Sequence, residues 1–184
     1  MTLRALLDNT IASWKRERPD LDLAAMGSVL RVNQFMNAAL RGAEALFAPH
    51  GITPGEFDVL AALRRGGAGT VLTPTALARV AMISPAGMTN RLNRLEAAGL
   101  IVRRPDPDDR RGSHVELTPS GHAVADRAVE DLVAAENALF GELSATERQR
   151  LDRILDKLID RLDRVPTDAS VPWPAVVQAL RSEK

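Results

Sequence analysis

The chain has 184 residues with 24 basic and 24 acidic side chains; 45% of its residues are apolar, 3% are aromatic and none is Cys. The lack of Cys excludes disulfides, thiolate zinc sites and thiol-based redox sensing, and it fits a reducing cytoplasm. No apolar run approaches the roughly 20 residues that span a bilayer, and residues 1–18 lack the apolar block of a signal peptide, so we expect a cytoplasmic protein without a membrane partner.

The N-terminal part of the chain is predicted to form two helices. The first, an extra helix within residues 1–18, has an apolar stripe made by Leu3, Leu7, Ile11 and Trp14, and Pro19 ends it. The second lies within residues 23–50 and stops before Gly51. Because aromatic residues are scarce, the helices must pack through aliphatic side chains.

Three helix starts follow in short succession. Residues 53–56 form a capping box with Pro at the first helical position. Thr73 and Ser84, each followed by Pro, start two further helices. Gly99 supplies the left-handed residue that ends the last of these helices.

The periodicity then changes from helical to extended. Residues 100–104 and 114–117 are predicted to be the two strands of a hairpin, joined by a turn-rich loop. Two long helices follow within residues 118–164, the second starting at a capping box at Ser144. The C-terminal tail, residues 165–184, is either a flexible appendage or a clasp on a dimer.

These elements predict a mainly α fold with a small β-hairpin wing. Two short helices followed by a hairpin make a winged helix-turn-helix, here a DNA-binding domain over residues 53–117. We expect helices within residues 23–50 and 118–164 to hold a homodimer. Across its two-fold axis, Leu132, Leu139 and Leu143 are expected to pack against Leu3 and Leu7 of the partner subunit.

The helix that starts at Ser84 is the expected reader of DNA. At about 100° per residue, its aliphatic residues share one face, which must be core: Met88, Leu92 and Leu95. The opposite face carries Thr89, Asn90, Asn93 and Arg94. Asn can pair with adenine and Arg with guanine in the major groove. The alternative is a solvated polar face without a function, which the hairpin that follows makes less favourable.

The loop of the hairpin carries Arg110 and Arg111, which can enter a narrow minor groove. The alternative is a solvated loop in which these side chains pair with Asp106, Asp108 and Asp109. The two interpretations are compatible if one Arg pairs with an Asp and stabilises the hairpin while the other contacts DNA.

These motifs resemble the MarR family. Asp109 and Arg111, with the later run from Val115 to Gly121, look like its wing signature, and residues 88–100 are similar to its recognition helix. The resemblance covers about residues 23–164. It implies a homodimer that binds double-stranded DNA at a pseudo-palindrome, usually as a repressor, and that a small anionic or phenolic ligand releases.

The extra N-terminal helix and residues 55–60 resemble the urate-responsive branch of that family. This likeness implies a site for a small anionic aromatic effector, such as urate or another purine, formed by Trp14, Asp58, Arg91 and Arg103. The chain departs from the branch at Asn93, where relatives often carry Asp, and at residues 84–87. Because Asn93 faces the groove, its departure affects the DNA sequence that is read.

The residues themselves support part of this assignment. Arg91 lies beside the aliphatic stripe of its helix, where a guanidinium needs an anion, and Asp58 is the only charge in an otherwise apolar helical segment. An Asp58–Arg91 pair joining the two helices solves both problems. Such a pair can also be purely structural, and Trp14 can be a packing residue of its stripe.

Other function classes find little support. The three His residues have no metal-ligand spacing, and no phosphate loop or nucleophile elbow is present. We therefore expect no enzyme, no catalytic residue, no cofactor and no metal. The remaining alternatives are a winged helix that binds protein and a MarR-type regulator of a different aromatic acid.

Overall fold

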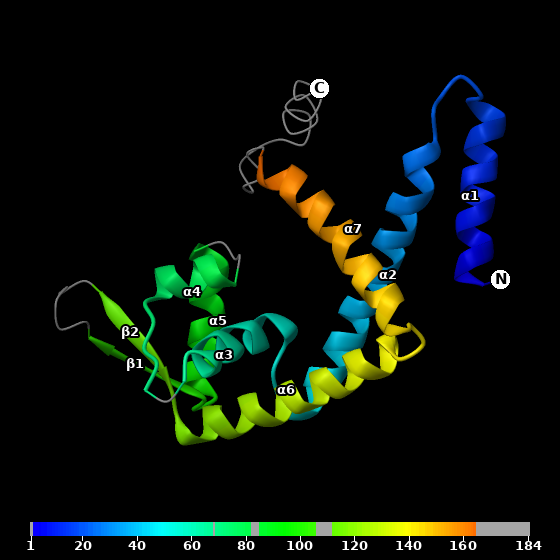
Figure 1. Ribbon diagram of the computed structural model, residues 1–184. Coiled ribbons are helices and arrows are strands. Elements are labelled where there is room, and N and C mark those ends of the chain that lie inside the picture. Colours follow the sequence, from blue (N-terminus) through cyan, green and yellow to red (C-terminus); the bar gives the residue numbers. More distant parts are fainter. Residues whose placement is uncertain (1, 68, 82–84, 106–111, 165–184) are drawn as a thin grey trace. The chain divides into compact units, whose positions relative to one another are not determined.

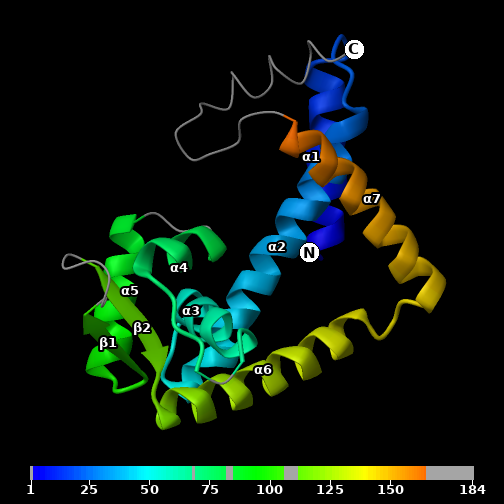
Figure 2. The ribbon, with the colours of Figure 1, turned by 60° about the vertical axis from the view of Figure 1, so that its left-hand side comes forward.

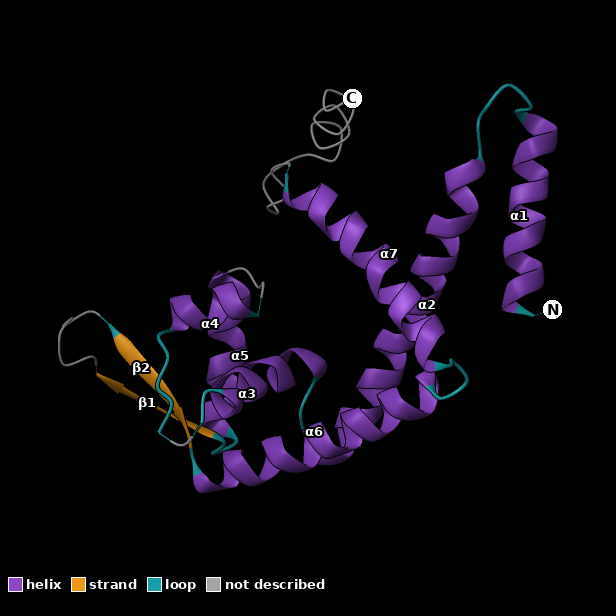
Figure 3. Ribbon diagram, in the orientation of Figure 1, coloured by secondary structure: helices purple, strands orange, loops and turns teal. Residues whose placement is uncertain are grey.

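The computed structural model describes residues 2–67, 69–81, 85–105 and 112–164, and it is mainly helical with one hairpin, as the sequence predicts (Figures 1 and 3). The described elements, in chain order, are the helices α1 (Leu3–Glu17) and α2 (Ala24–Phe47), the 3-10 turn η1 (Ala48–His50), the helices α3 (Pro54–Arg65), α4 (Pro74–Val80) and α5 (Pro85–Ala97), the strands β1 (Ile101–Pro105) and β2 (Ser113–Leu117), and the helices α6 (Pro119–Phe140) and α7 (Ala145–Asp163). The turn η1 was not predicted.

Contacts divide the chain into two compact units, residues 1–133 and residues 134–184. The first unit holds α1 to α5, the hairpin and most of α6, and the second holds the end of α6 and α7. Within the part that the structure describes, no helix is long and apolar enough to cross a membrane.

The helices α1 and α2 lie side by side in the first unit (Figure 2). Thr2 caps α1 by accepting a hydrogen bond from the backbone N–H of Ala5, and Asp8 pairs with Arg31 of α2 at 2.9 Å. Leu7 is buried within its own chain, whereas Leu3 is 53% exposed. The expectation that Leu7 packs against a partner subunit is therefore wrong, because the protomer itself already covers this side chain.

Aliphatic side chains build the core of the first unit around α3. Val59 and Leu60 are fully buried, and Phe57 stacks on Phe47 with ring centroids 4.4 Å apart. The core cluster extends into α5, the hairpin and the first half of α6. It fixes the short helices and the hairpin as one body.

The predicted caps explain why the helices begin where they do. Thr53 and Glu56 form the capping box of α3, and Ser144 and Glu147 form that of α7. Thr73 caps α4. Gly99 follows α5 with φ of 69°, the left-handed conformation that was expected there.

The hairpin pairs β1 with β2 in antiparallel register, with Arg103 opposite Val115. A short bridge between Leu72 and Val115 adds a third segment, which the sequence did not predict. The start of α6 lies against the turn before β1, where Thr118 donates to the carbonyl oxygens of Gly99 and Leu100. A Cβ atom at Gly121 would collide with the backbone of Leu100, so glycine permits this close approach.

Candidate nucleic-acid interface

The helix α5, called here the reading helix, is anchored by aliphatic residues and presents polar ones. Met88, Leu92 and Leu95 are each 1% exposed and pack in the core. The residues on the other face are all exposed, namely Thr89, Asn90, Asn93 and Arg94. The reading helix thus offers hydroxyl, amide and guanidinium groups to a neighbouring molecule.

Arg94 is tied to the start of α3 by a buried carboxylate. Its Nε lies 2.8 Å from Oε1 of Glu56, whose side chain is 8% exposed while that of Arg94 is 62% exposed. The other oxygen of Glu56 accepts from the backbone N–H and the hydroxyl of Thr53, at 2.8 and 2.9 Å. Glu56 therefore caps α3 and also orients Arg94 on the surface of the reading helix.

A second ionic link joins the reading helix to the wing. Arg103 of β1 donates from Nε to Oε2 of Glu96 at 2.9 Å and from Nη2 to Oδ1 of Asn93 at 2.7 Å. The hydrogen bonds from Arg103 lower the pKa of Glu96. Arg103, which the sequence placed in an effector site, is therefore already engaged by two residues of the reading helix.

Arg91 occupies the space that a glycine leaves at the start of α3. The residue is half-buried, and a Cβ atom at Gly55 would lie 2.5 Å from its Nη2 and 2.8 Å from its Cζ. The guanidinium therefore lies directly over the backbone of α3. A larger residue at this position would displace it.

Asp58 does not form the direct pair with Arg91 that the sequence predicted. Among the ion pairs of described residues none joins them, and Asp58 is exposed on α3 rather than buried in an apolar environment. Partial loss of hydration raises the pKa of its carboxyl, while the charges of Arg91 and then Arg65 oppose this rise. The two side chains thus attract each other at longer range, because an exposed carboxylate keeps enough water to need no contact partner.

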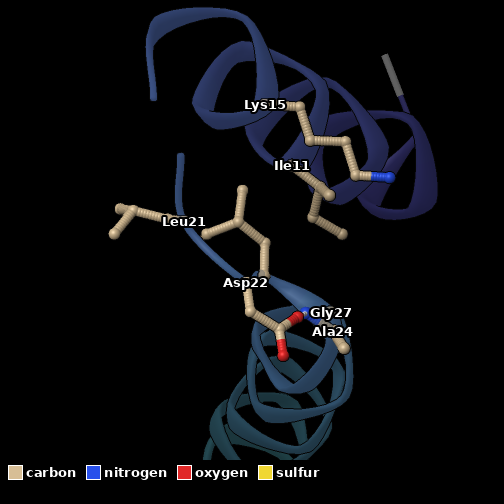
Figure 4. Close-up of a pocket in the computed structure, with 7 residues that line it drawn as sticks. Ile11, Lys15, Leu21, Asp22, Ala24 and Gly27 are labelled. Atoms are coloured by element: carbon tan, nitrogen blue, oxygen red, sulfur yellow. Dashed lines mark hydrogen bonds between the residues drawn. The ribbon is translucent and has the colours of Figure 1, made fainter. Parts of the chain in front are cut away.

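Of the remaining predicted site residues, Trp14 lies on α1 and the others fall outside the described residues. Trp14 is 46% exposed on α1. A pocket of about 410 Å³ beside that helix is lined by Ile11, Lys15, Leu21, Asp22, Leu23, Ala24 and Gly27, none of which was predicted (Figure 4). The predicted DNA contacts Ser84, Arg110 and Arg111 fall outside the described residues.

Three residues of this interface were missed by sequence reasoning. Glu56 was assigned only to a cap, Glu96 was given no role, and Gly55 was only part of a motif. Glu96 lies three residues after Asn93, so the two share a helix face. This spacing was visible in the sequence, whereas the strand residue that bridges them was not.

Comparison with known proteins shows which family has this arrangement of a helix and a hairpin. Residues 50–112 match the MarR family. The HTH-type transcriptional regulator PecS of Dickeya dadantii is 34% identical over 155 residues, which cover 83% of this chain and 92% of PecS.

Two solved structures have a similar fold. One is a cysteine-to-serine mutant of E. coli MarR complexed with operator DNA, with a TM-score of 0.61, 26% identity and coverage of 75% of this chain and 99% of MarR. The other is Bordetella bronchiseptica BpsR, whose DNA binding is regulated by 6-hydroxynicotinic acid, with a TM-score of 0.57, 28% identity and coverage of 70% and 98%. Together with the relationship to PecS, these findings show that the chain belongs to the MarR family of winged helix-turn-helix transcription regulators.

Proposed function

We propose that the protein is a cytoplasmic, homodimeric repressor that binds a pseudo-palindromic operator and leaves it when a small anionic aromatic ligand such as urate binds. The observation that carries this proposal is the reading helix, which buries three aliphatic residues and exposes four polar ones beside a hairpin. Such a helix fits the major groove, where amide and guanidinium groups can contact base edges.

The DNA contacts divide into two sets with different tasks. Thr89, Asn90, Asn93 and Arg94 are the proposed contacts to base edges. Ser84, Arg110 and Arg111 are the proposed contacts to phosphates and to the minor groove beside the site. The first group determines which DNA sequence is preferred, and the second group contributes affinity that depends on salt.

The proposed dimer rests on apolar side chains that the protomer leaves exposed. On α2 these are Val29, Val32, Phe35, Met36 and Leu40, and on α7 they are Ile154, Leu155, Leu158, Ile159 and Leu162. Large exposed apolar faces are rare on monomers and typical of interfaces. A second copy of the chain is the occupant that a pseudo-palindromic operator requires.

The proposed effector site is formed by Trp14, Asp58, Arg91 and Arg103. Arg91 supports it, because a half-buried guanidinium without a contact anion among the described residues can bind a carboxylate or a urate anion. The ligand would repel Asp58 and compete with Glu96 for Arg103. Either effect moves the reading helix and breaks the match between two half-sites about 34 Å apart. The effector of BpsR, 6-hydroxynicotinic acid, is of the same chemical class.

DNA binding is tested by fluorescence anisotropy with a duplex from the region upstream of the gene, over a range of salt concentrations. The wild-type protein is expected to bind with a steep salt dependence, and Arg111→Ala should weaken binding and reduce the slope by about one. No binding to any duplex would refute the proposal and favour the alternative, a winged helix that binds protein. An unchanged slope would assign Arg111 to bracing the wing.

Effector release is tested by titrating urate and 6-hydroxynicotinate into the protein–DNA complex. Wild type is expected to release DNA with one of them, and Asp58→Asn should shift the midpoint of release. Equal release by both proteins would remove Asp58 from the mechanism. Release by 6-hydroxynicotinate alone would assign the protein to aromatic acids other than urate.

A further inference from the structure

Asn93 is held by a side chain that can only donate hydrogen bonds. Nη2 of Arg103 lies 2.7 Å from the side-chain oxygen of Asn93. A guanidinium has five N–H donors and no acceptor. The amide must therefore turn its oxygen toward Arg103, which leaves its NH₂ group as the end that another molecule can meet.

Glu96 keeps Arg103 in this position. Its carboxylate accepts from the backbone N–H of Arg103 at 3.3 Å and from Nε at 2.9 Å, and it also contacts Nη2. The side chain of Arg103 is only 28% exposed, and its backbone is paired with the fully buried Val115. The guanidinium is thus fixed from both the strand and the helix, so it cannot turn away from Asn93 without losing several hydrogen bonds.

The outer side of Asn93 is open to a ligand. The residue is exposed, and its NH₂ group has no partner within the described ranges. Arg94, the next residue on the same face, is held in place by Glu56. The two residues therefore present a fixed row of donors and no acceptor.

We propose that Asn93 reads DNA as a hydrogen-bond donor only, so that the base facing it in each half-site is guanine or thymine. The inference rests on the proposed function, in which the reading helix enters the major groove. Guanine O6 and N7 and thymine O4 accept hydrogen bonds there, whereas cytosine N4 donates them. Adenine N7 also accepts, but adenine N6 beside it is a donor that would face the NH₂ group, so adenine loses one of its two contacts and is disfavoured. An unrestrained Asn binds adenine through its oxygen and its NH₂ together, and Arg103 removes the oxygen from that contact.

The test is selection of binding sites from a random library of duplexes. Comparison of wild type with Asn93→Ala identifies the position that Asn93 reads, because its preference is lost in the variant. At this position wild type is expected to favour guanine and thymine over adenine and cytosine by about tenfold.

Two variants change the hydrogen-bonding character of this position in opposite ways. Arg103→Met frees the oxygen, so adenine is expected to become the favoured base. Asn93→Asp presents acceptors only, so adenine and cytosine are expected to replace guanine and thymine. If Arg103→Met does not fold, this variant alone tests whether Asn93 reads as a donor. Arg104→Met is the matched control, because Arg104 is the next residue of β1 and pairs with Glu116 instead; it should keep the wild-type preference.

Several outcomes would overturn the inference. Selection of adenine by wild type at that position, or a preference that Asn93→Ala does not change, would show that Asn93 does not read as a donor. If Arg103 merely braces the wing, Arg103→Met will weaken all sequences equally and leave the preference as it is. Selection of no sequence at all by wild type would instead refute the DNA-binding function itself.

Discussion

Asp58 shows how the exposure of a residue and the hydration of its carboxyl can differ. The residue is exposed, yet neighbouring atoms reduce its hydration enough to raise its pKa above the ordinary value of 3.8, against the attraction of Arg91 and Arg65. A carboxyl with a raised pKa in the folded state binds its proton more tightly there than in the unfolded chain. Its contribution to stability therefore falls as pH rises from 3.8 through the raised pKa, and it is constant above that value.

Because the pKa of Asp58 is raised, we predict that Asp58→Asn is as stable as wild type at pH 7 or slightly more stable. The gain in the free energy of unfolding should not exceed about 1 kcal/mol, because solvent screens the site. The difference should shrink as the pH falls through the raised pKa to 3.8 and below, where Asp58 becomes protonated in both states. Urea unfolding between pH 3 and pH 8 measures it. A clear loss of stability at pH 7 would show that attraction to Arg91 outweighs the cost of lost hydration.

Gly55 makes room for Arg91, which leads to a second prediction at this scale. In Gly55→Ala the new methyl group must push the guanidinium aside, and the better helix propensity of Ala offsets part of this cost. The free energy of unfolding should change by less than about 1 kcal/mol, whereas effector release should need more urate or 6-hydroxynicotinate. Gly42→Ala is the control, since nothing lies within 4 Å of its added carbon; it should gain stability and leave release unchanged. Unchanged release by Gly55→Ala would exclude Arg91 from the effector site.

At the scale of secondary-structure elements, the chain contains the same capping box in two environments. Glu56 of α3 is 6% exposed and also holds Arg94, whereas Glu147 of α7 is exposed. In both, the Glu accepts from the backbone N–H and the hydroxyl of the cap residue. The hydrogen bonds to Ser144 lower the pKa of Glu147, so its cap weakens only when the pH falls through that lowered value.

Glu56→Ala should therefore destabilise the protein by about 2 kcal/mol, because it removes a cap and the partner of Arg94 from a buried position. Thermal unfolding followed by circular dichroism should show a Tm lower by about 6 °C. Glu147→Ala is the matched control, and it should lose less free energy of unfolding. Glu56→Gln keeps the size of the side chain and its cap, so the stability that this variant loses measures the ion pair with Arg94 alone. Equal losses in the two Ala variants would mean that neither the burial of Glu56 nor its contact with Arg94 contributes to stability.

The sequence could predict these elements because their signals are local. Caps, prolines and Gly99 placed the helix ends, and the buried face of the reading helix followed from its period. The bridge between Leu72 and Val115, and the links from Arg94 to Glu56 and from Arg103 to Asn93, depend on how separate elements approach each other in space. No periodicity in one element contains that information, so the direct Asp58–Arg91 pair was predicted where a longer-range attraction exists.

For the whole molecule, the proposed dimer would link the exposed apolar residues of α2 to DNA binding. Four of them, Val29, Val32, Met36 and Leu40, fall within an arc of about 80° on the helix. Burying such a stripe against its copy brings two reading helices into one assembly. Binding of the second half-site then becomes intramolecular, which strengthens operator binding by a factor of about 100 or more.

Leu40→Glu places a charge in this stripe, on a side chain that is 54% exposed in the protomer. We predict that sedimentation velocity will show a monomer with unchanged helix content, because the substitution affects no core residue, and that affinity for a two-half-site duplex will fall at least about 100-fold. Affinity for a single half-site should remain the same. Ala38→Glu is the control, since Ala38 is exposed on the opposite side of α2 and should leave the dimer intact. A Leu40→Glu protein that stays dimeric would move the interface away from this helix face, and a monomer with full operator affinity would show that one reading helix suffices.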